Sequence, residues 1–511
     1  MRKQTKLVAV LSAAALLAMG ASMTSFAAGW EKDDAGVWHY YDSDDEMVTD
    51  EWKKDGGKWF HLDDEGDMET NTWVDDDYYV GEDGAMLTNA WKYTMSDDDQ
   101  DDPDSDGKHW YYFNNKGKKV ADQDKKINGK TYLFNEDGEM LYGWQDWQGA
   151  IYYFGEEMDG ARTENKWLWL EKSGMLDTDE DVQKTVPGCS ENDICDDEGW
   201  YWFNASGKMY KDAKQKKING KYYYFNNHGQ MLYEWINGVK ANVASNAKLD
   251  SDSIEATASE VRYMNVVEEG WRADGWYQID GADALKAGDD TDWYYFKDGK
   301  AKKADDGEKN NTDLTDDGAK VYTKKIKING KNFCFNEIGQ MQTGLQMIDK
   351  KFYYFDNDGY MKTGKIANVE EEDDNYTYYF ETKNGKNGQG YTGEKSGYLY
   401  WNGKRLEADD DYRIYVVDKK YYLVNNKGKL QKSTSKEYDV ENFGDDVKFT
   451  FRNTYEIASS TKDGSEGTYK NAATLPKIEL FDNAIYQDAL GVTHYENTDA
   501  YEAAQNAVAN K

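Results

Sequence analysis

A single sequence motif recurs along most of the chain: two to four aromatic residues, a polar turn that contains glycine, and then methionine or another apolar residue. Residues 38–41 (WHYY) lead to Met47, residues 59–62 (WFHL) lead to Met68, and further copies follow at a period of about 20 residues. A unit of this length cannot bury an apolar face by itself, so neighbouring units must bury their faces against one another. The repeat therefore restricts the chain to a one-dimensional array in which each unit packs on the next.

Each unit has the pattern of a β-hairpin, because aromatic-rich strands flank turns of Asn, Asp and Gly. The turn Asn128-Gly129, which recurs at 219–220 and 329–330, supplies the positive φ that a tight hairpin needs. One such hairpin is only marginally stable alone. We therefore predict an all-β chain of tandem β-hairpin repeats that form an elongated β-solenoid, with short insertions and a small C-terminal α+β or capping segment.

Interruptions of the repeat suggest the boundaries of the segments. We expect a signal peptide at 1–27, tryptophan-rich repeats at 28–95, an acidic linker at 96–108, repeats at 109–237 with a cysteine-containing insertion at 177–198, a helix-sized insertion at 238–270, repeats at 271–435, and a C-terminal cap or small module at 436–511.

The N-terminus has the pattern of a secretory signal peptide. Basic residues precede an apolar run from Leu7 to Met19, and Ser25 and Ala27 stand at the small-residue positions of a cleavage site. The run is shorter than the roughly 20 apolar residues that span a bilayer. We therefore expect a secreted chain with no transmembrane anchor in its mature form.

Composition limits the partners. The chain has 62 Lys and Arg against 98 Asp and Glu, a formal charge of −36, which disfavours nucleic acid as a partner. Its 41 Tyr and 18 Trp are unusual for a disordered polypeptide, which is normally poor in aromatic residues. Both numbers fit an aromatic repeat with acidic turns on the outside.

The N-terminal phrases resemble a known family. Gly29-Trp30, then residues 36–41 (GVWHYY) and residues 47–49 (MVT), resemble the cell-wall-binding repeats, which include choline-binding and glucan-binding repeats. The later units that begin Ile-Asn-Gly-Lys are similar to the carbohydrate-binding repeats of clostridial toxins, and the resemblance spans residues 29–435 with interruptions. It implies a hairpin solenoid, non-covalently associated with the bacterial cell wall, that binds choline of teichoic acid or polysaccharide chains in aromatic boxes between consecutive hairpins.

The candidate ligand-binding residues are the tryptophans and neighbouring rings of these phrases, with methionines as walls of the boxes. A quaternary ammonium cannot donate a hydrogen bond, so its recognition relies on several aromatic faces arranged around the cation. The alternative is that these rings form only the core between repeats. The candidates are Trp30, Trp38, Tyr40, Met47, Trp52, Trp59, Met68, Trp73, Tyr78, Met86, Trp91, Trp110, Trp144, Trp200 and Trp235, and Trp271, Trp276 and Trp293 continue the series.

The three cysteines are too few for a disulfide-built scaffold. In a secreted chain, Cys189 and Cys195 predict a small disulfide loop within the insertion. Cys334 lies in a repeat strand between two phenylalanines, which is typical of a lone packed thiol.

An acidic run has part of the pattern of a calcium loop. Asp102, Asp104 and Asp106 alternate as oxygen ligands would, but Phe113 stands where an EF-hand needs its bidentate glutamate. The pattern favours a solvated linker, and we predict no metal site and no cofactor.

No catalytic constellation is evident in the sequence. The five histidines are scattered, whereas a zinc hydrolase needs clustered ligands. We therefore predict a non-enzymatic surface protein that binds a cell-wall polymer. Two alternatives stay open: a cell-wall hydrolase or host-glycan-binding protein whose repeats serve as a targeting module, and a structural stalk without a ligand.

Overall fold

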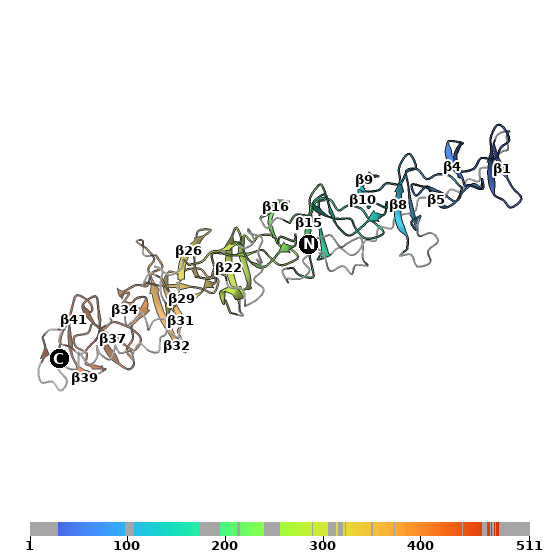
Figure 1. Ribbon diagram of the computed structural model, residues 1–511. Helices are drawn as coiled ribbons and strands as arrows, with labels where there is room; N and C mark the ends of the chain where they lie inside the picture. The colour runs from blue at the N-terminus through green and yellow to red at the C-terminus, as the bar shows by residue number, and fades with distance from the viewer. Residues whose placement is uncertain are drawn as a thin grey trace. The chain divides into compact units, whose positions relative to one another are not determined.

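The computed structural model describes residues 29–479 with gaps at 98–106, 173–194, 212–214, 240–255, 289, 305–312, 315–319, 322, 349–350, 372–373, 384, 386, 442, 462–467, 471, 473–474 and 476. The described residues form β-strands joined by turns, with one short 3-10 helix, η2 (Asp283–Leu285) (Figure 1). These residues divide into two compact units, of which unit 1 takes the described residues up to Leu232 and unit 2 takes those from Tyr233 onward. The prediction of an all-β chain of tandem hairpins is confirmed.

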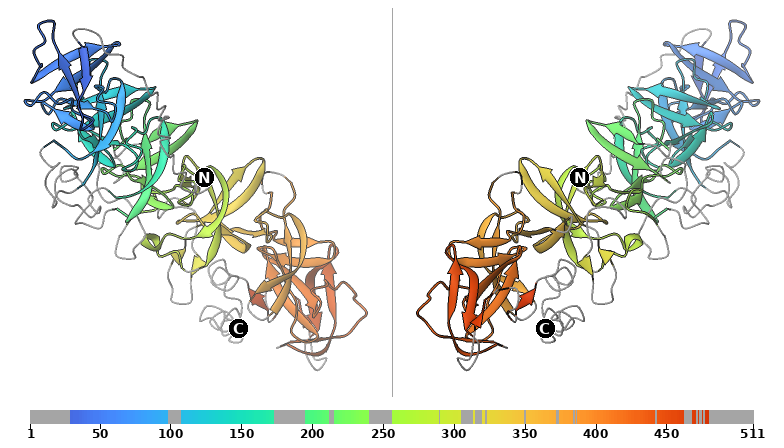
Figure 2. Two further views of the ribbon diagram at one scale, coloured as in Figure 1. Left: turned by 90° about the vertical axis from the view of Figure 1, so that its right-hand side faces the viewer. Right: turned by 90° about the vertical axis from the view of Figure 1, so that its left-hand side faces the viewer.

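Unit 1 is a succession of antiparallel hairpins, some of which carry a short third strand. Its strands are β1 (Gly29–Lys32), β2 (Trp38–Tyr41), β3 (Glu51–Asp55), β4 (Lys58–Leu62), β5 (Thr72–Val74), β6 (Tyr78–Val80), β7 (Ala90–Thr94), β8 (His109–Phe113), β9 (Gln123–Ile127), β10 (Lys130–Phe134), β11 (Met140–Leu141), β12 (Trp144–Trp147), β13 (Ala150–Tyr153), β14 (Lys166–Glu171), β15 (Glu198–Phe203), β16 (Lys216–Ile218), β17 (Lys221–Phe225) and β18 (Met231–Leu232). Figure 2 shows these hairpins, coloured blue to green, following one another.

Unit 2 continues the hairpins and ends in larger sheets. Its strands are β19 (Trp235–Asn237), β20 (Val261–Tyr263), β21 (Gly275–Asp280), β22 (Thr291–Lys297), β23 (Lys300–Ala301), β24 (Asp313–Leu314), β25 (Lys320–Val321), β26 (Thr323–Ile328), β27 (Lys331–Asn336), β28 (Met341–Gln342), β29 (Gly344–Ile348), β30 (Lys351–Phe355), β31 (Gly364–Glu371), β32 (Asp374–Phe380), β33 (Gly393–Lys395), β34 (Tyr398–Trp401), β35 (Lys404–Arg405), β36 (Tyr412–Val417), β37 (Lys420–Asn425), β38 (Tyr438–Val440), β39 (Gly444–Val447), β40 (Phe449–Arg452), β41 (Glu456–Thr461), β42 (Thr468–Tyr469) and β43 (Ile478–Glu479).

An Asp or Asn side chain organises the turn after the second strand in several repeats. In the turn after β4, Oδ1 of Asp63 accepts the backbone N–H of Glu65 at 3.1 Å and that of Asp67 at 2.7 Å. A short polar side chain that bonds its own backbone two residues on is the mark of an Asx turn. The same pair of bonds recurs in the turns that begin at Asp42, Asn204, Asn226, Asn336 and Asn425, and the first bond of the pair is present at Asn114.

Successive hairpins are joined by backbone hydrogen bonds from the residue that follows this turn. Met68 N–H donates to the Trp38 carbonyl of the preceding hairpin at 2.8 Å, and Met86 N–H donates to the Trp59 carbonyl at the same distance. Met209 N–H bonds Ile151 O in the same way. Each hairpin is therefore held to its neighbour by main-chain bonds as well as by ring packing, as a repeat array requires.

Methionine side chains pack on the turn glycine of the following hairpin. A Cβ added at Gly117, which has φ +84°, would lie 2.4 Å from Met86 Sδ, and one at Gly84 would lie 2.7 Å from Met68 Cε. Glycine is needed at these turns both for the positive φ and for the space that the methionine fills.

Two predicted segments differ in the structure. The insertion at 238–270 is not helical in its described part, since Val261–Tyr263 form strand β20, which pairs with β19 and completes a hairpin. The C-terminal module begins earlier than residue 436, because β36 and β37 belong to the same eight-stranded sheet as β38–β43.

The C-terminal sheet has its own core. β36 pairs in parallel with β38 and with β43, so residues distant in the sequence are joined in one sheet. Ile414, Leu423, Val447 and Phe449 are buried in this core. The regular elements described in this module are all strands. Residues 480–511 of the predicted C-terminal segment lie outside the described residues.

Candidate aromatic binding sites

A four-ring cluster recurs where one hairpin meets the next. Its centre is a tryptophan on the first strand of a hairpin, and the second strand of that hairpin contributes one ring. Two further rings come from the second strand of the following hairpin. Around Trp91 the ring centroids lie at 5.1 Å (Tyr112), 4.8 Å (Tyr132) and 5.7 Å (Phe134). Rings at these separations gain favourable edge and offset-stacked contacts beyond their burial.

A left-handed residue two positions ahead directs several of these tryptophans. Asn71, Asn89 and Asn165 have φ of 51°, 48° and 48°, and each stands two residues before Trp73, Trp91 or Trp167 respectively. Asparagine tolerates this conformation better than most residues. The Asn-x-Trp spacing therefore starts a new hairpin with its tryptophan facing the next one.

Three of the clusters are sealed by a hydrogen bond from the indole. Trp73 Nε1 donates to Met95 O at 2.8 Å, Trp144 Nε1 to Glu171 O at 3.2 Å, and Trp235 Nε1 to Asp280 O at 2.9 Å. In each case the acceptor belongs to the following hairpin. We call these three the sealed clusters. Their partner rings are Tyr79, Tyr111 and Phe113 for Trp73, Tyr153, Tyr201 and Phe203 for Trp144, and Tyr263, Tyr294 and Phe296 for Trp235.

Three other clusters, which we call the double-tryptophan clusters, have a second tryptophan on the same hairpin. Trp91 and Trp110 lie 6.2 Å apart at 87°, and Trp276 and Trp293 lie 6.4 Å apart at 77°. The third cluster has Trp167 beside Trp202 at 5.3 Å. The remaining rings are Tyr223 and Phe225 for Trp167, and Tyr295, Phe333 and Phe335 for Trp276.

The first two hairpins have looser versions of the same arrangement. Trp30 contacts Tyr40 and Phe60 at 5.3 Å each, and Trp52 contacts Tyr78 at 5.5 Å. The second tryptophans of these hairpins are Trp38 and Trp59. Lys32 Nζ lies 5.5 Å from the Trp38 ring and Lys54 Nζ lies 5.6 Å from the Trp59 ring, so an ammonium stands near each second tryptophan.

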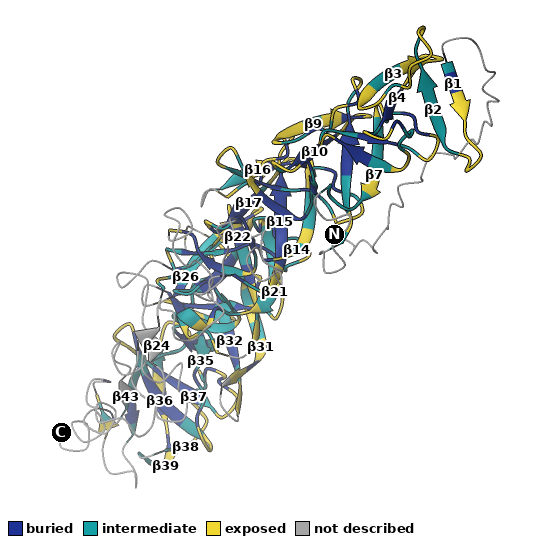
Figure 3. Ribbon diagram, turned by 45° about the vertical axis from the view of Figure 1, so that its right-hand side comes forward, coloured by how far each residue is buried: buried dark blue, intermediate teal, exposed yellow. Residues whose placement is uncertain are grey.

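Exposure separates the predicted candidate rings into three groups: buried, exposed and half-buried. Trp30, Trp73, Trp144 and Trp200 are buried, whereas Trp59 and Trp293 expose 39% and 42% of their surface. The other predicted rings, at Trp38, Tyr40, Trp52, Tyr78, Trp91, Trp110 and Trp235, are half-buried. Figure 3 shows the same contrast along the chain, with β15 mostly dark blue and β3 and β9 largely yellow.

The methionines that were predicted as walls of an aromatic box pack instead on turn glycines in the structure. Met47, Met68 and Met86 each lie against the turn glycine of the next hairpin, at Gly66, Gly84 and Gly117. They act as spacers between hairpins, and Met68 also packs against the cluster around Trp30 and Phe60.

Two indole nitrogens in these clusters have no hydrogen-bond partner among the described residues. Nε1 of Trp30 and Nε1 of Trp110 are buried and unpaired. A buried donor without a partner costs stability. Trp110 thus differs from the sealed tryptophans, whose N–H groups are all bonded.

Burial raises the pKa of three phenols in the clusters and so favours their neutral form. Burial raises the pKa of Tyr153 and that of Tyr263 to about 12, and it raises the pKa of Tyr201 further. The attraction of these rings for a cation therefore comes from the ring quadrupole and not from a phenolate charge.

One hairpin holds an internal cation in the position of the central tryptophan. On β26, Lys325 pairs with Cys334 in the register where Trp276 pairs with Tyr295 on the preceding hairpin. Its Nζ lies 4.1 Å from the ring centroid of Tyr353 on the following hairpin. An ammonium can therefore occupy the space between hairpins that an indole fills elsewhere.

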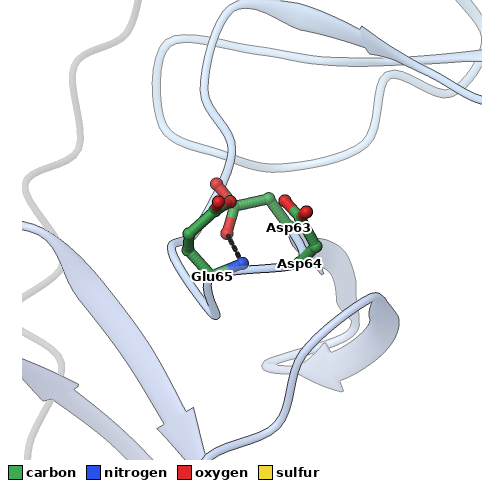
Figure 4. A group of neighbouring side chains, drawn as sticks. All are labelled: Asp63, Asp64 and Glu65. Carbon is green, nitrogen blue, oxygen red and sulfur yellow. Dashed lines mark hydrogen bonds between the residues drawn. The ribbon is translucent and has the colours of Figure 1, made fainter.

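An acidic group in the turn after β4 is the one set of possible metal ligands among the described residues. Figure 4 shows Asp63, Asp64 and Glu65, with the Asp63 carboxylate accepting the Glu65 N–H. The neighbouring Asp64 carboxyl raises the pKa of Glu65. Asp63 is already used by the turn, so the group is explained as an acidic turn. Asp102, Asp104 and Asp106 lie outside the described residues.

The cysteines agree in part with the sequence analysis. Cys195 is disulfide-bonded, and its sulfur also lies 3.3 Å from Nδ2 of Asn226. Cys189 lies outside the described residues, so the pairing between the two stays a prediction. Cys334 is a free, buried thiol, as expected.

Sequence reasoning missed Trp167, Trp169 and Trp202. The insertion that follows β14 separates the two strands of their hairpin, so the tandem phrase is hard to see. The signal that could have found them is the Asn165-Lys166-Trp167 spacing, which matches Asn89-Ala90-Trp91. Trp169 packs on Trp200 at 5.6 Å and donates its Nε1–H to the Glu198 carboxylate.

Family models match many of these hairpins. Choline-binding repeat models match residues 46–85, 67–93, 124–167 and 342–389, and a cell wall binding repeat model matches residues 105–119, 194–209 and 216–231. This chain carries choline-binding repeats. Such repeats indicate binding to the cell wall or its glycans and association with the cell surface. Among the described residues no helix has the length and apolar character to cross a membrane.

Two curated proteins that are similar to this chain are much longer than it. Glucosyltransferase-I of Streptococcus downei is 25% identical over 319 residues, which are 55% of this chain and 19% of the enzyme. The chain spans less than a fifth of the length of the curated glucosyltransferases it matches.

The solved structures that match this chain have low sequence identity and low TM-scores. The modular autolysin LytC of Streptococcus pneumoniae is 19% identical, covers 66% of this chain and 52% of its own, and has a TM-score of 0.32. The choline-binding domain of CbpL from the same organism is 20% identical, covers 47% of this chain and 97% of its own, and has a TM-score of 0.27.

Proposed function

We propose that this chain is a secreted, non-enzymatic surface protein that binds the choline groups of a cell-wall teichoic acid at the junctions between its hairpins. The observation that carries the proposal is the recurring pair of perpendicular indoles, Trp91 with Trp110 and Trp276 with Trp293, each next to rings of the following hairpin. The two pairs belong to different units and still have nearly the same geometry, which indicates a built arrangement.

Perpendicular indoles suit a quaternary ammonium. A T-shaped pair of rings has a corner on either side, bounded by one face of each ring, and a cation in that corner lies over two faces at once. Cation–π attraction extends to about 6 Å from a ring centroid and contributes about 0.5 to 2 kcal/mol per ring, depending on desolvation. Because a quaternary ammonium needs no hydrogen-bond acceptor, a site made only of rings is sufficient.

The chain supports this chemistry in two further ways. Lys325 places its own ammonium 4.1 Å from the Tyr353 ring, so rings of the hairpin junctions already hold a cation. A formal charge of −36 also attracts a cationic group and repels a purely anionic polymer.

Several weak sites on one chain would act together on a polymer that repeats its choline groups. Linked sites can exceed the affinity of a single site by about 10² to 10⁴ when the polymer spans them. Millimolar affinity for free choline is therefore compatible with firm attachment to a wall.

Titration calorimetry of the chain with choline chloride tests the proposal, with sodium chloride as the ionic control. We expect saturable heat, and we expect the double variant Trp110→Ala/Trp293→Ala to lose two sites while the affinity of the remaining sites is unchanged. Met158→Ala is the control variant, because Met158 exposes 48% of its surface and belongs to none of the ring clusters. No saturable heat with choline, or an unchanged number of sites in the double variant, would contradict the proposal.

A glycan ligand is the second candidate, favoured by the exposed indoles of Trp59 and Trp293 and by the similarity to glucosyltransferases. A sugar can lay its C–H face on an exposed aromatic ring. Titration with isomaltose under the same conditions distinguishes the two, because a glycan site responds to isomaltose and not to choline.

A further inference from the structure

Hairpins of three kinds follow one another in a fixed order along the chain. A hairpin with one central tryptophan is followed by a double-tryptophan hairpin with a long loop, and then by a hairpin with an Asn-Gly turn. The order occurs at β5–β6, β7–β8 and β9–β10, and again at β12–β13, β14–β15 and β16–β17. It occurs a third time at β19–β20, β21–β22 and β26–β27, where the short pair β24–β25 lies between the last two hairpins in the sequence. Two of the three sets lie in unit 1 and the third in unit 2, so the order is independent of the unit.

The acceptor of each sealing bond has a constant place in this order. Met95, Glu171 and Asp280 each stand four residues after the central tryptophan of the long-loop hairpin, where the first strand runs out into its loop. The strand is still extended there, so its carbonyl reaches the indole of the preceding hairpin.

The third hairpin of each set has no such acceptor. Its first strand ends at an isoleucine, and the next residue is the turn asparagine, Asn128, Asn219 or Asn329, with φ of 48°, 49° and 48°. The backbone turns back at this point. No sealing bond of this kind is present on Trp91, Trp167 or Trp276 in the part of the chain that the structure describes.

The angle between the tryptophan ring and the last phenylalanine ring also separates the sealed clusters from the double-tryptophan clusters. In the sealed clusters the tryptophan plane is inclined to that of the last phenylalanine by 54° at Trp73, 39° at Trp144 and 60° at Trp235. In the double-tryptophan clusters the corresponding angles are 28° at Trp91, 13° at Trp167 and 23° at Trp276. The indole thus has two orientations, and the sealing bond accompanies one of them.

We infer that the loop length of the following hairpin decides whether a junction binds a ligand. A long loop extends the strand, supplies the carbonyl and makes the junction a structural staple. An Asn-Gly turn supplies no carbonyl acceptor for the indole, so the junction remains able to bind a choline group. Within the three sets, ligand sites then recur at every third junction, at Trp91, Trp167 and Trp276, and the junctions at Trp73, Trp144 and Trp235 bind nothing. The inference rests on the proposed function for the identity of the ligand, but the seal itself does not depend on it.

Indole N–H spectroscopy of the chain labelled with [¹⁵N-indole]tryptophan tests both parts. Resonances are assigned with single Trp→Phe variants, of which Trp73→Phe and Trp91→Phe form a matched pair in adjacent hairpins. We expect the indole N–H groups of Trp73, Trp144 and Trp235 to exchange with D₂O at least about tenfold more slowly than those of Trp91, Trp167 and Trp276. On addition of choline chloride, the second group should shift and the first should not.

The outcomes are distinct. Slow exchange at the three sealed indoles together with choline shifts confined to the double-tryptophan clusters supports the inference. Equal exchange rates in the two groups, or choline shifts at Trp73, Trp144 and Trp235, overturn it. Slow exchange at the sealed indoles with no choline shift anywhere supports the seal and refutes choline as the ligand, which separates the failure of the proposed function from that of the inference.

Discussion

Trp144 and Trp59 are both predicted ligand residues of unit 1, but the structure assigns them opposite roles, and substitution by alanine separates these roles. Trp144 is 2% exposed, contacts the rings of Tyr153, Tyr201 and Phe203, and donates its indole N–H to Glu171 O. Trp59 is 39% exposed and has Lys54 Nζ 5.6 Å from its ring. The first is a staple between two hairpins, and the second is a surface ring.

The magnitudes follow from burial. Replacing a buried tryptophan by alanine costs about 3 to 5 kcal/mol, of which the lost hydrogen bond is about 1 kcal/mol. Trp59 keeps more than a third of its surface in water, so its replacement should cost about 1 kcal/mol or less. The two variants should therefore differ by about 2 to 4 kcal/mol in the free energy of unfolding.

Urea unfolding followed by far-ultraviolet circular dichroism measures the difference. With a slope of about 2 to 3 kcal/mol per molar urea, Trp144→Ala should lower the midpoint of unit 1 by about 1 to 2 M, and Trp59→Ala by less than about 0.5 M. Equal midpoints for the two variants would refute the reasoning, and so would a Trp144→Ala midpoint within about 0.3 M of the unsubstituted chain.

Two further predictions concern a turn and a thiol. Gly117→Ala and Gly129→Ala both place alanine at positive φ, which costs about 1 to 2 kcal/mol, but only the first would press on Met86, whereas the second has open space. The additional loss in Gly117→Ala should disappear in the background of Met86→Ala, as measured by urea midpoints. Burial raises the pKa of Cys334 to about 12, so its thiol should not react with Ellman's reagent at pH 8 until the chain is unfolded. Because the folded-state pKa is raised, the stability from burying the neutral thiol is complete below the unfolded pKa of about 8.5 and declines as the pH rises toward 12.

The sequence predicts the hairpins because their information is local. The aromatic residues, the Asx turn and the glycine after it lie within one unit, so each repeat can be recognised from its own sequence. The same locality explains the error at 238–270. Arg262 stands where other repeats have an aromatic residue, and β20 forms only because it pairs with β19 across a long insertion.

The C-terminal sheet could not be predicted in the same way. The parallel pairings of β36 with β38 and β43 join residues that no repeat relates. Parallel pairs leave no hairpin turn in the sequence as a signal, since they need long connections. The start of this module near residue 412 follows only from the pairing.

The division of the tryptophans into those with and those without a hydrogen bond to the next hairpin could not be predicted, because the acceptor atoms belong to the backbone. The carbonyl groups of Met95, Glu171 and Asp280 act through their position on an extended strand, so their side chains carry no pattern. The sequence does contain the information, as the length of the loop in the next hairpin. The loop length can be interpreted only when the structure shows which indole faces which strand.

A repeat array that binds its ligand between units must remain folded when the ligand is absent. Stability in such an array is approximately the sum of the contributions of its units and of the junctions between neighbours. The sealed junctions at Trp73, Trp144 and Trp235 contribute their full packing and a hydrogen bond without a ligand. Under the proposed function, the junctions at Trp30, Trp52, Trp91 and Trp167 in unit 1, and at Trp276 in unit 2, should contribute more when a ligand occupies them. A ligand at tenfold its dissociation constant stabilises each occupied site by about 1.4 kcal/mol. Unit 1 should therefore gain more thermal stability from choline than unit 2, because it has more unsealed junctions.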